Sequence, residues 1–175
     1  MRMYTTADLL RDIAFFNPGW RPADIDQRAR LLRQAGWLPD GGRGRAQPPI
    51  EARHAAHMLI GLAAARKAVD VVTATDRYVA LRSRDGGALR DFSTLGEAVE
   101  AILGDEALSG AVTRLTICRS WPEATISLRK ARKAKKGKKK AVQRFGASAG
   151  GAGHIRIDAV VAGEMLVEIA RRLAS

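Results

Sequence analysis

The chain has 175 residues, 46% of them hydrophobic and only 5% aromatic, which allows one compact domain or two small ones with a core of Ala, Leu, Ile and Val. A single cysteine, Cys118, excludes an internal disulfide framework, and the apolar stretches are too short for a signal peptide or a membrane span, so we expect a cytoplasmic protein. The 30 Lys and Arg residues against 18 Asp and Glu give a net charge of +12. This balance favours a phosphate-bearing partner, because neutralised phosphates release condensed counterions.

Three helices are predicted in the first 65 residues. Thr5 or Thr6 can cap a helix over 6–16, which the sequence Asn-Pro-Gly then ends. A second helix is predicted over 22–36 and a third over 50–65, and the Gly- and Pro-rich segment between them can form only a turn, a loop or a tight hairpin.

The second helix has one apolar stripe and one polar face. Ile25, Ala29 and Leu32 follow helical spacing and are predicted to face the core. The opposite face then carries residues that could pair with bases, with two arginines on its flanks: Gln27, Arg30 and Gln34 pointing outward, and Arg28 and Arg33 beside them. Gln and Arg are also ordinary soluble helix formers, which is the alternative reading of this face.

The middle of the chain is predicted to be helical and the last third to be mixed. The third helix can continue or restart as far as Leu81, SRDGG breaks it, and Ser93 or Thr94 caps a further helix that ends at Leu103. From Val112 the apolar residues alternate instead, which is typical of strands.

The last third is predicted to form a hairpin, a third strand and a final helix. The hairpin pairs 112–118 with 124–130, the third strand covers 154–157, and the helix covers about 160–173. We therefore expect an α+β chain that ends in a three-stranded antiparallel sheet with a terminal helix.

The positive charge is concentrated in one segment. Ten Lys and Arg residues lie between Arg129 and Arg144, no acid occurs from residue 124 to 157, and the rest of the chain has a net charge of only +2. This run has no aromatic residue, so we expect it to contact phosphates without reading sequence. The alternative is a disordered, solubilising loop. The contacts predicted within the run are Arg132, Lys133, Lys135, Lys136, Lys138, Lys139 and Lys140.

The segment 28–45, RARLLRQAGWLPDGGRGR, followed by IEARHAAHMLIGL, resembles the DNA-binding domain of MerR-type winged-helix proteins. Gln34 to Pro39 match the element with which that family ends its helix, and the residues after Pro39 match its basic wing. Leu31-Leu32 stand where the family has an aromatic pair, and Ala46-Gln47-Pro48 replace its Tyr-Arg close. The resemblance therefore implies a winged helix-turn-helix shape and not the effector sensing of that family. More loosely, the chain resembles uncharacterised proteins from prophage and gene-transfer-agent regions of bacteria.

The resemblance covers roughly the first 65 residues and implies three further DNA contacts. Residues 1–65 would form the winged helix-turn-helix, and the patterns after it predict a helical connection over 66–110 and a small α+β domain over 111–175 with a flexible basic loop over 129–153. The second helix would enter the major groove. Arg21 before it would contact phosphate, and Arg43 and Arg45 in the wing would contact phosphate or the minor groove, unless the wing is a mobile solvated loop.

Residue patterns for catalysis or cofactor binding are missing from the sequence. His54 and His57 are three residues apart on one helix, but no further ligand lies near them in sequence, so we expect packing or capping roles. Cys118 lies in a strand-like run and is expected to pack as a small hydrophobic residue. Neither a phosphate-binding GxxxxGK[ST] loop nor a dinucleotide fingerprint occurs. We predict no enzyme, no metal and no cofactor.

These patterns lead to three functional hypotheses. The first is a sequence-specific regulator of transcription that binds double-stranded DNA, associates with the nucleoid, has a phage origin and, in the manner usual for palindromic sites, forms a homodimer. The second is a sequence-tolerant nucleic-acid-binding protein, for RNA or for DNA packaging, that acts through the lysine run, Lys130–Lys140. The third is an adaptor whose basic loop binds an acidic protein.

Overall fold

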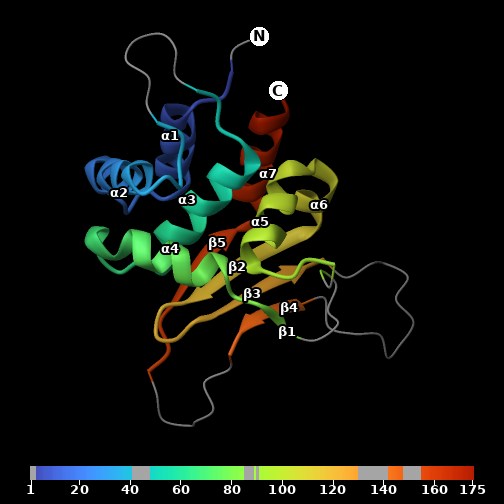
Figure 1. Ribbon diagram of the computed structural model, residues 1–175. Helices are drawn as coiled ribbons and strands as arrows, with labels where there is room; N and C mark the ends of the chain where they lie inside the picture. Colours follow the sequence, from blue (N-terminus) through green and yellow to red (C-terminus); the bar gives the residue numbers. More distant parts are fainter. Residues whose placement is uncertain (1–2, 41–47, 85–88, 90, 130–141, 148–154) are drawn as a thin grey trace.

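The computed structural model describes residues 3–40, 48–84, 89, 91–129, 142–147 and 155–175, and these form an α+β fold in which helices cover one face of a sheet (Figure 1). The helices are α1 Thr6–Phe16, α2 Pro22–Gln34, α3 Ala52–Ala64, the short 3-10 helix η1 Ala68–Asp70, α4 Val71–Val79, α5 Leu95–Gly104, α6 Glu106–Ala111 and α7 Gly163–Ala174. The strands are β1 Ser83–Arg84, β2 Val112–Cys118, β3 Glu123–Leu128, β4 Val142–Gly146 and β5 Asp158–Ala162.

The strands form one antiparallel sheet in the order β1-β4-β3-β2-β5. The predicted hairpin is confirmed, but its second strand covers Glu123–Leu128 and not 124–130, and Leu115 lies opposite Ile126. The predicted three-stranded sheet is wrong, because β4 and the two-residue β1 extend it on the β3 side. The last strand also begins at Asp158, after the predicted 154–157, and occupies residues that were expected to open the final helix.

Local signals account for the ends of several helices. The side chain of Thr5 accepts a hydrogen bond from the backbone of Asp8, and that of Thr94 accepts one from Glu97; the acid returns a bond to the capping residue in both cases. Both capping predictions are confirmed. After α2, Gly36 adopts a positive φ of 79°, which a glycine tolerates at the end of a helix.

One hydrophobic core joins the two halves of the chain. On the sheet, the inward-facing residues include Leu115, Ile117, Ile126 and Phe145, and they belong to the same buried cluster as residues of α1, α2, α3, α5 and α7. The predicted boundaries near residues 65 and 110 therefore do not separate independent cores. None of the helices in the described part of the chain has the length and apolar character that crossing a bilayer requires.

Candidate nucleic-acid interface

The face of the sheet opposite the helices is polar and basic on β1 to β4, while β5 adds the exposed Val160 to it. Successive residues of a strand point to opposite faces of the sheet, so the residues between the buried ones point away from the core. Paired positions put Thr116, Thr125, Arg144 and Arg84 in one row across four strands. The next row pairs Arg114 with Ser127. We call these six residues the outer sheet face.

The arginines of the outer sheet face are free of acidic partners. Within the described residues, the guanidinium groups of Arg84, Arg114 and Arg144 form neither an ion pair nor a hydrogen bond, and Arg114 and Arg144 are exposed. With strands about 4.8 Å apart and alternate residues about 6.8 Å apart, the Cα atoms of Arg114 and Arg144 are separated by roughly 12 Å. The three cations are therefore available to a polyanion that spans the sheet.

Among the described residues, the acids of this face lie at one end of it, where two carboxylates share one arginine. Glu123 and Asp158 lie at the ends of β3 and β5 that are remote from Arg114. Arg156 bridges them, with its Nε 2.7 Å from Asp158 Oδ2 and its Nη1 3.3 Å from Glu123 Oε1. Together with Arg156 the two carboxylates keep a net charge of −1, at the end of the face that is remote from Arg114.

The lysine run starts and ends beside the outer sheet face. Arg129 directly follows β3, and its backbone N–H donates to Ala111 O at 2.8 Å. Val142 opens β4 and pairs with Ser127, which is the neighbour of Arg114. Residues 130–141, which include Arg132 and all the predicted lysine contacts, lie outside the described residues. Their two attachment points are at the Arg114 end of the face.

The polar face of α2 is placed as the sequence predicts. Gln27, Arg30 and Gln34 are exposed, while Ile25, Ala29 and Leu32 are buried against the core. Arg21 is exposed just before the helix, and its backbone caps the first turn. Two carboxylates, Asp24 and Asp26, are also exposed on the first half of α2, so this face has mixed charge.

Arg28 does not lie on an accessible flank of α2. Its side chain is only 7% exposed, and its guanidinium donates to the backbone oxygens of Ala65 and Arg66 at 3.3 Å. Its Cζ lies 5.2 Å from the centroid of the Trp20 ring. The predicted DNA contact is corrected to a structural role, because the guanidinium fixes α2 to the C-terminal end of α3. No sequence pattern indicates that this helix end lies beside Arg28.

Three predicted contacts remain: Arg33 at the end of α2, and Arg43 and Arg45 in the predicted wing. Arg33 is half-buried, and its Nε has no hydrogen-bond partner in the described structure. Arg43 and Arg45 of the predicted wing lie outside the described residues. On the N-terminal side of that segment Leu38 is buried, and on its C-terminal side Ile50 is buried, so both ends of the segment are anchored in the core.

Both histidines of α3 have structural partners. The Nδ1 atom of His54 accepts a hydrogen bond from the Glu51 backbone at 3.1 Å, and His57 stacks edge-to-face on Trp37 at 4.5 Å. Burial lowers the pKa of each imidazole below its ordinary value. The predicted capping and packing roles are confirmed, as is the burial of Cys118. Within the described residues, no three His, Cys, Asp or Glu side chains gather at one point.

No protein-family model, curated protein or solved structure matches the chain.

Proposed function

We propose that this protein binds nucleic acid, with double-stranded DNA as its target, through phosphate contacts from the outer sheet face and the lysine run. One observation carries the proposal: within the described residues, three arginines without acidic partners line the sheet face opposite the helices, and the lysine run begins and ends at one end of it. Cations that neutralise phosphates gain affinity by releasing condensed counterions.

The chemistry of the face favours backbone contacts over base recognition. Single-stranded nucleic acids are usually held by aromatic side chains on which bases stack, whereas the outer sheet face has only arginines and hydroxyls. Arg114 and Arg144 can contact phosphates, and Thr116, Thr125 and Ser127 can donate hydrogen bonds to phosphate oxygens. Such contacts position a duplex without reading its sequence, which fits DNA packaging and also accommodates helical RNA.

Removing two charges from this face tests the proposal. The double substitution Arg114→Gln/Arg144→Gln is expected to weaken the binding of an arbitrary 20-base-pair duplex by about fifty-fold near 0.1 M salt, because two phosphate contacts change the salt slope by about 1.8. Fluorescence anisotropy measures the loss, and the melting temperature should stay unchanged since both side chains are exposed.

The matched control removes the same charge elsewhere. Arg53→Gln/Arg77→Gln alters exposed positions on α3 and α4, away from the sheet. An equal loss in this control would mean that only net charge matters, and the outer sheet face would then not be the interface. Titration with duplex RNA in parallel determines whether the surface prefers DNA.

A second candidate, a sequence-specific transcriptional regulator with a winged helix-turn-helix, is favoured by the joint exposure of Gln27, Arg30 and Gln34 on α2. Here α2 would read the major groove as part of a dimer on a palindromic site in the nucleoid.

The regulator hypothesis predicts an effect confined to one preferred sequence. Selection from a random duplex library should yield such a site, and Arg30→Ala should weaken it by about tenfold or more, since one good base contact is worth roughly 1–3 kcal/mol. The wing substitution Arg43→Ala should act in the same way. Equal losses on the selected site and on random DNA would exclude base reading by α2.

A further inference from the structure

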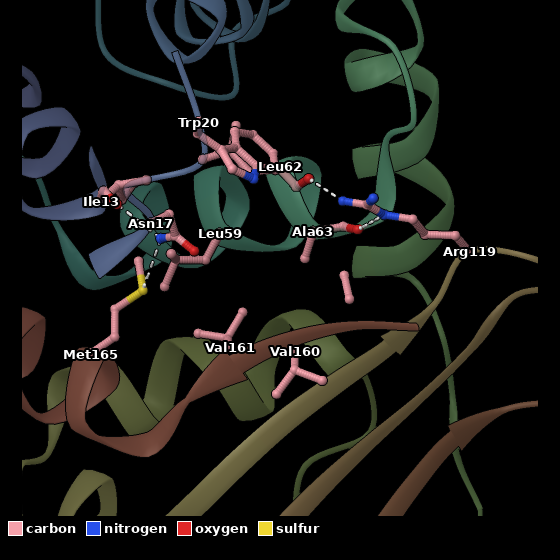
Figure 2. Close-up of a pocket in the computed structure, with 11 residues that line it drawn as sticks. Ile13, Asn17, Trp20, Leu59, Leu62, Ala63, Arg119, Val160, Val161 and Met165 are labelled. Atoms are coloured by element: carbon pink, nitrogen blue, oxygen red, sulfur yellow. Dashed lines mark hydrogen bonds between the residues drawn. The ribbon is translucent and has the colours of Figure 1, made fainter. Parts of the chain in front are cut away.

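A groove on the helical side of the molecule lies apart from the outer sheet face. It runs between the connection from α1 to α2, the C-terminal end of α3, and β5 (Figure 2). One part, which we call the apolar pocket, has a volume of 210 Å³. The other part, the arginine pocket, has a volume of 260 Å³. Trp20 and Arg119 line both parts, so the two pockets are neighbours.

The apolar pocket offers a hydrophobic wall and one free acceptor. Its lining includes Ile13, Leu59, Leu62, Val161 and Met165. The amide nitrogen of Asn17 donates to Ile13 O at 2.8 Å and approaches the Met165 sulfur at 3.7 Å. In Figure 2 the amide oxygen of Asn17 points away from Met165, and no described residue donates a hydrogen bond to it. An apolar ring that carries an N–H donor would fit this arrangement.

The arginine pocket contains cations whose positions are fixed by the backbone. Arg119 donates from Nε to Ala63 O at 2.6 Å and from Nη2 to Leu62 O at 3.3 Å. Arg28 donates to the next two carbonyl oxygens, those of Ala65 and Arg66, at the same end of α3. Arg66 donates to the carbonyl oxygen of Arg119 at 3.5 Å. The carbonyls at a helix C-terminus attract cations, so these groups stay in place without a ligand.

The positive charge in this pocket exceeds what its own acid can balance. Arg21, Arg28, Arg66 and Arg119 line it, and Asp24 is the one carboxylate among its lining residues. Burial lowers the pKa of Arg28 and the neighbouring Arg119 lowers it further, while Asp24 and Asp70 act in the opposite direction. The pKa of Arg119 is lowered in the same way, mainly by burial and to a smaller extent by the positive charge of Arg66.

Arg28 also retains an unused donor. Its side chain is more than nine-tenths buried and lines the arginine pocket, and none of the residues that the structure describes forms a hydrogen bond with its Nε atom. Native structures satisfy most buried donors, so an unpaired one beside a cationic pocket indicates a missing acceptor. A phosphate provides several acceptor oxygens and the negative charge that the cluster lacks.

We propose that the groove binds a nucleotide, with its heterocycle in the apolar pocket and its phosphate among the four arginines. The N–H of the base would donate to the Asn17 oxygen, and the phosphate would lie on the other side of Trp20 and Arg119. Pockets of 210 and 260 Å³ together reach the usual range of ligand sites, roughly 300–1,000 Å³. A free mononucleotide and the 5′-phosphorylated end of a strand share this chemistry.

The test is isothermal titration of the full chain with AMP, with adenosine and with inorganic phosphate. AMP is expected to bind at least tenfold more tightly than either of the other two, because only AMP occupies both pockets. Arg66→Gln should weaken AMP binding by about tenfold, the effect of losing one charged contact. Asp24→Asn should strengthen it, because the carboxylate repels the phosphate. Both positions are exposed, so both variants should fold.

Two controls make the result specific. Arg77→Gln removes an equal charge outside the groove and should leave AMP binding unchanged. Arg114→Gln/Arg144→Gln should also leave it unchanged while weakening duplex binding, so this inference and the proposed function can fail independently. The inference is overturned if AMP binds no better than phosphate, or if Arg66→Gln and Asp24→Asn do not shift its affinity in opposite directions.

A short oligonucleotide identifies the natural source of the nucleotide. If a tetranucleotide with a 5′-phosphate binds more tightly than AMP, and its 5′-hydroxyl form does not, the groove takes a strand end. If AMP binds as tightly as the phosphorylated tetranucleotide, the groove takes a free nucleotide. Either outcome supports a nucleotide site.

Discussion

Replacing the six lysines of residues 133–140 by glutamine is expected to weaken duplex DNA binding about four-thousandfold near 0.1 M salt. If about four of these charges contact phosphates, the slope of log K against log salt becomes less steep by nearly 4, which corresponds to this loss. The residues replaced are Lys133, Lys135, Lys136, Lys138, Lys139 and Lys140. Anisotropy titrations at several salt concentrations measure both the affinity and the slope.

A variant with the same six lysines changed to arginine is the matched control. It keeps every charge and should keep the salt slope of the natural chain. Retention of most duplex affinity in the glutamine variant would exclude the lysine run from the interface. The affinity would then have to come from the outer sheet face or from α2, and the Arg114→Gln/Arg144→Gln and Arg30→Ala variants distinguish these two surfaces.

Gly146→Ala is expected to lower the free energy of unfolding by at least about 3 kcal/mol. Gly146 ends β4 with a φ of 78°, a conformation that costs other residues about 1–2 kcal/mol. A Cβ atom there would lie 2.1 Å from Pro122 O and 3.1 Å from Leu81 Cδ2, so the backbone of the β2–β3 turn would have to move. For a chain of this length the melting temperature should fall by about 10 °C.

Gly36→Ala provides the comparison for this prediction. Gly36 has nearly the same φ, 79°, but a Cβ atom there would meet nothing within 4 Å. The free energy of unfolding of Gly36→Ala should therefore fall only by the cost of the backbone conformation, about 1–2 kcal/mol. Equal losses in the two variants would show that Gly146 is not needed for the close approach of β4 to the turn. That approach matters for the proposed function, because it positions Arg144 on the outer sheet face.

Periodicity was sufficient to predict the elements with long regular patterns. The buried stripe of Ile25, Ala29 and Leu32, the cap at Thr94 and the hairpin of β2 and β3 all follow from spacing and from local hydrogen bonding, although the register of that hairpin does not. These features depend on neighbours in sequence, so a single sequence contains them.

Features that depend on contacts distant in sequence could not be predicted. β4 has five residues between a lysine-rich and a glycine-rich segment, and β1 has two, so neither shows a period. Arg114 could have been placed opposite the core by the alternation in VTRLTIC, but its proximity to Arg144 depends on the unforeseen β4. The burial of Arg28 depends on the C-terminal end of α3, which lies 37 residues further along the chain.

The most direct test of the central claim is the affinity of the intact chain for a duplex of arbitrary sequence as a function of salt. We predict a dissociation constant in the micromolar range or below at about 50 mM salt, and a log–log slope of about −4 or steeper. If the protein bound neither duplex DNA nor RNA at that salt concentration, phosphate recognition by the outer sheet face and the lysine run would be contradicted.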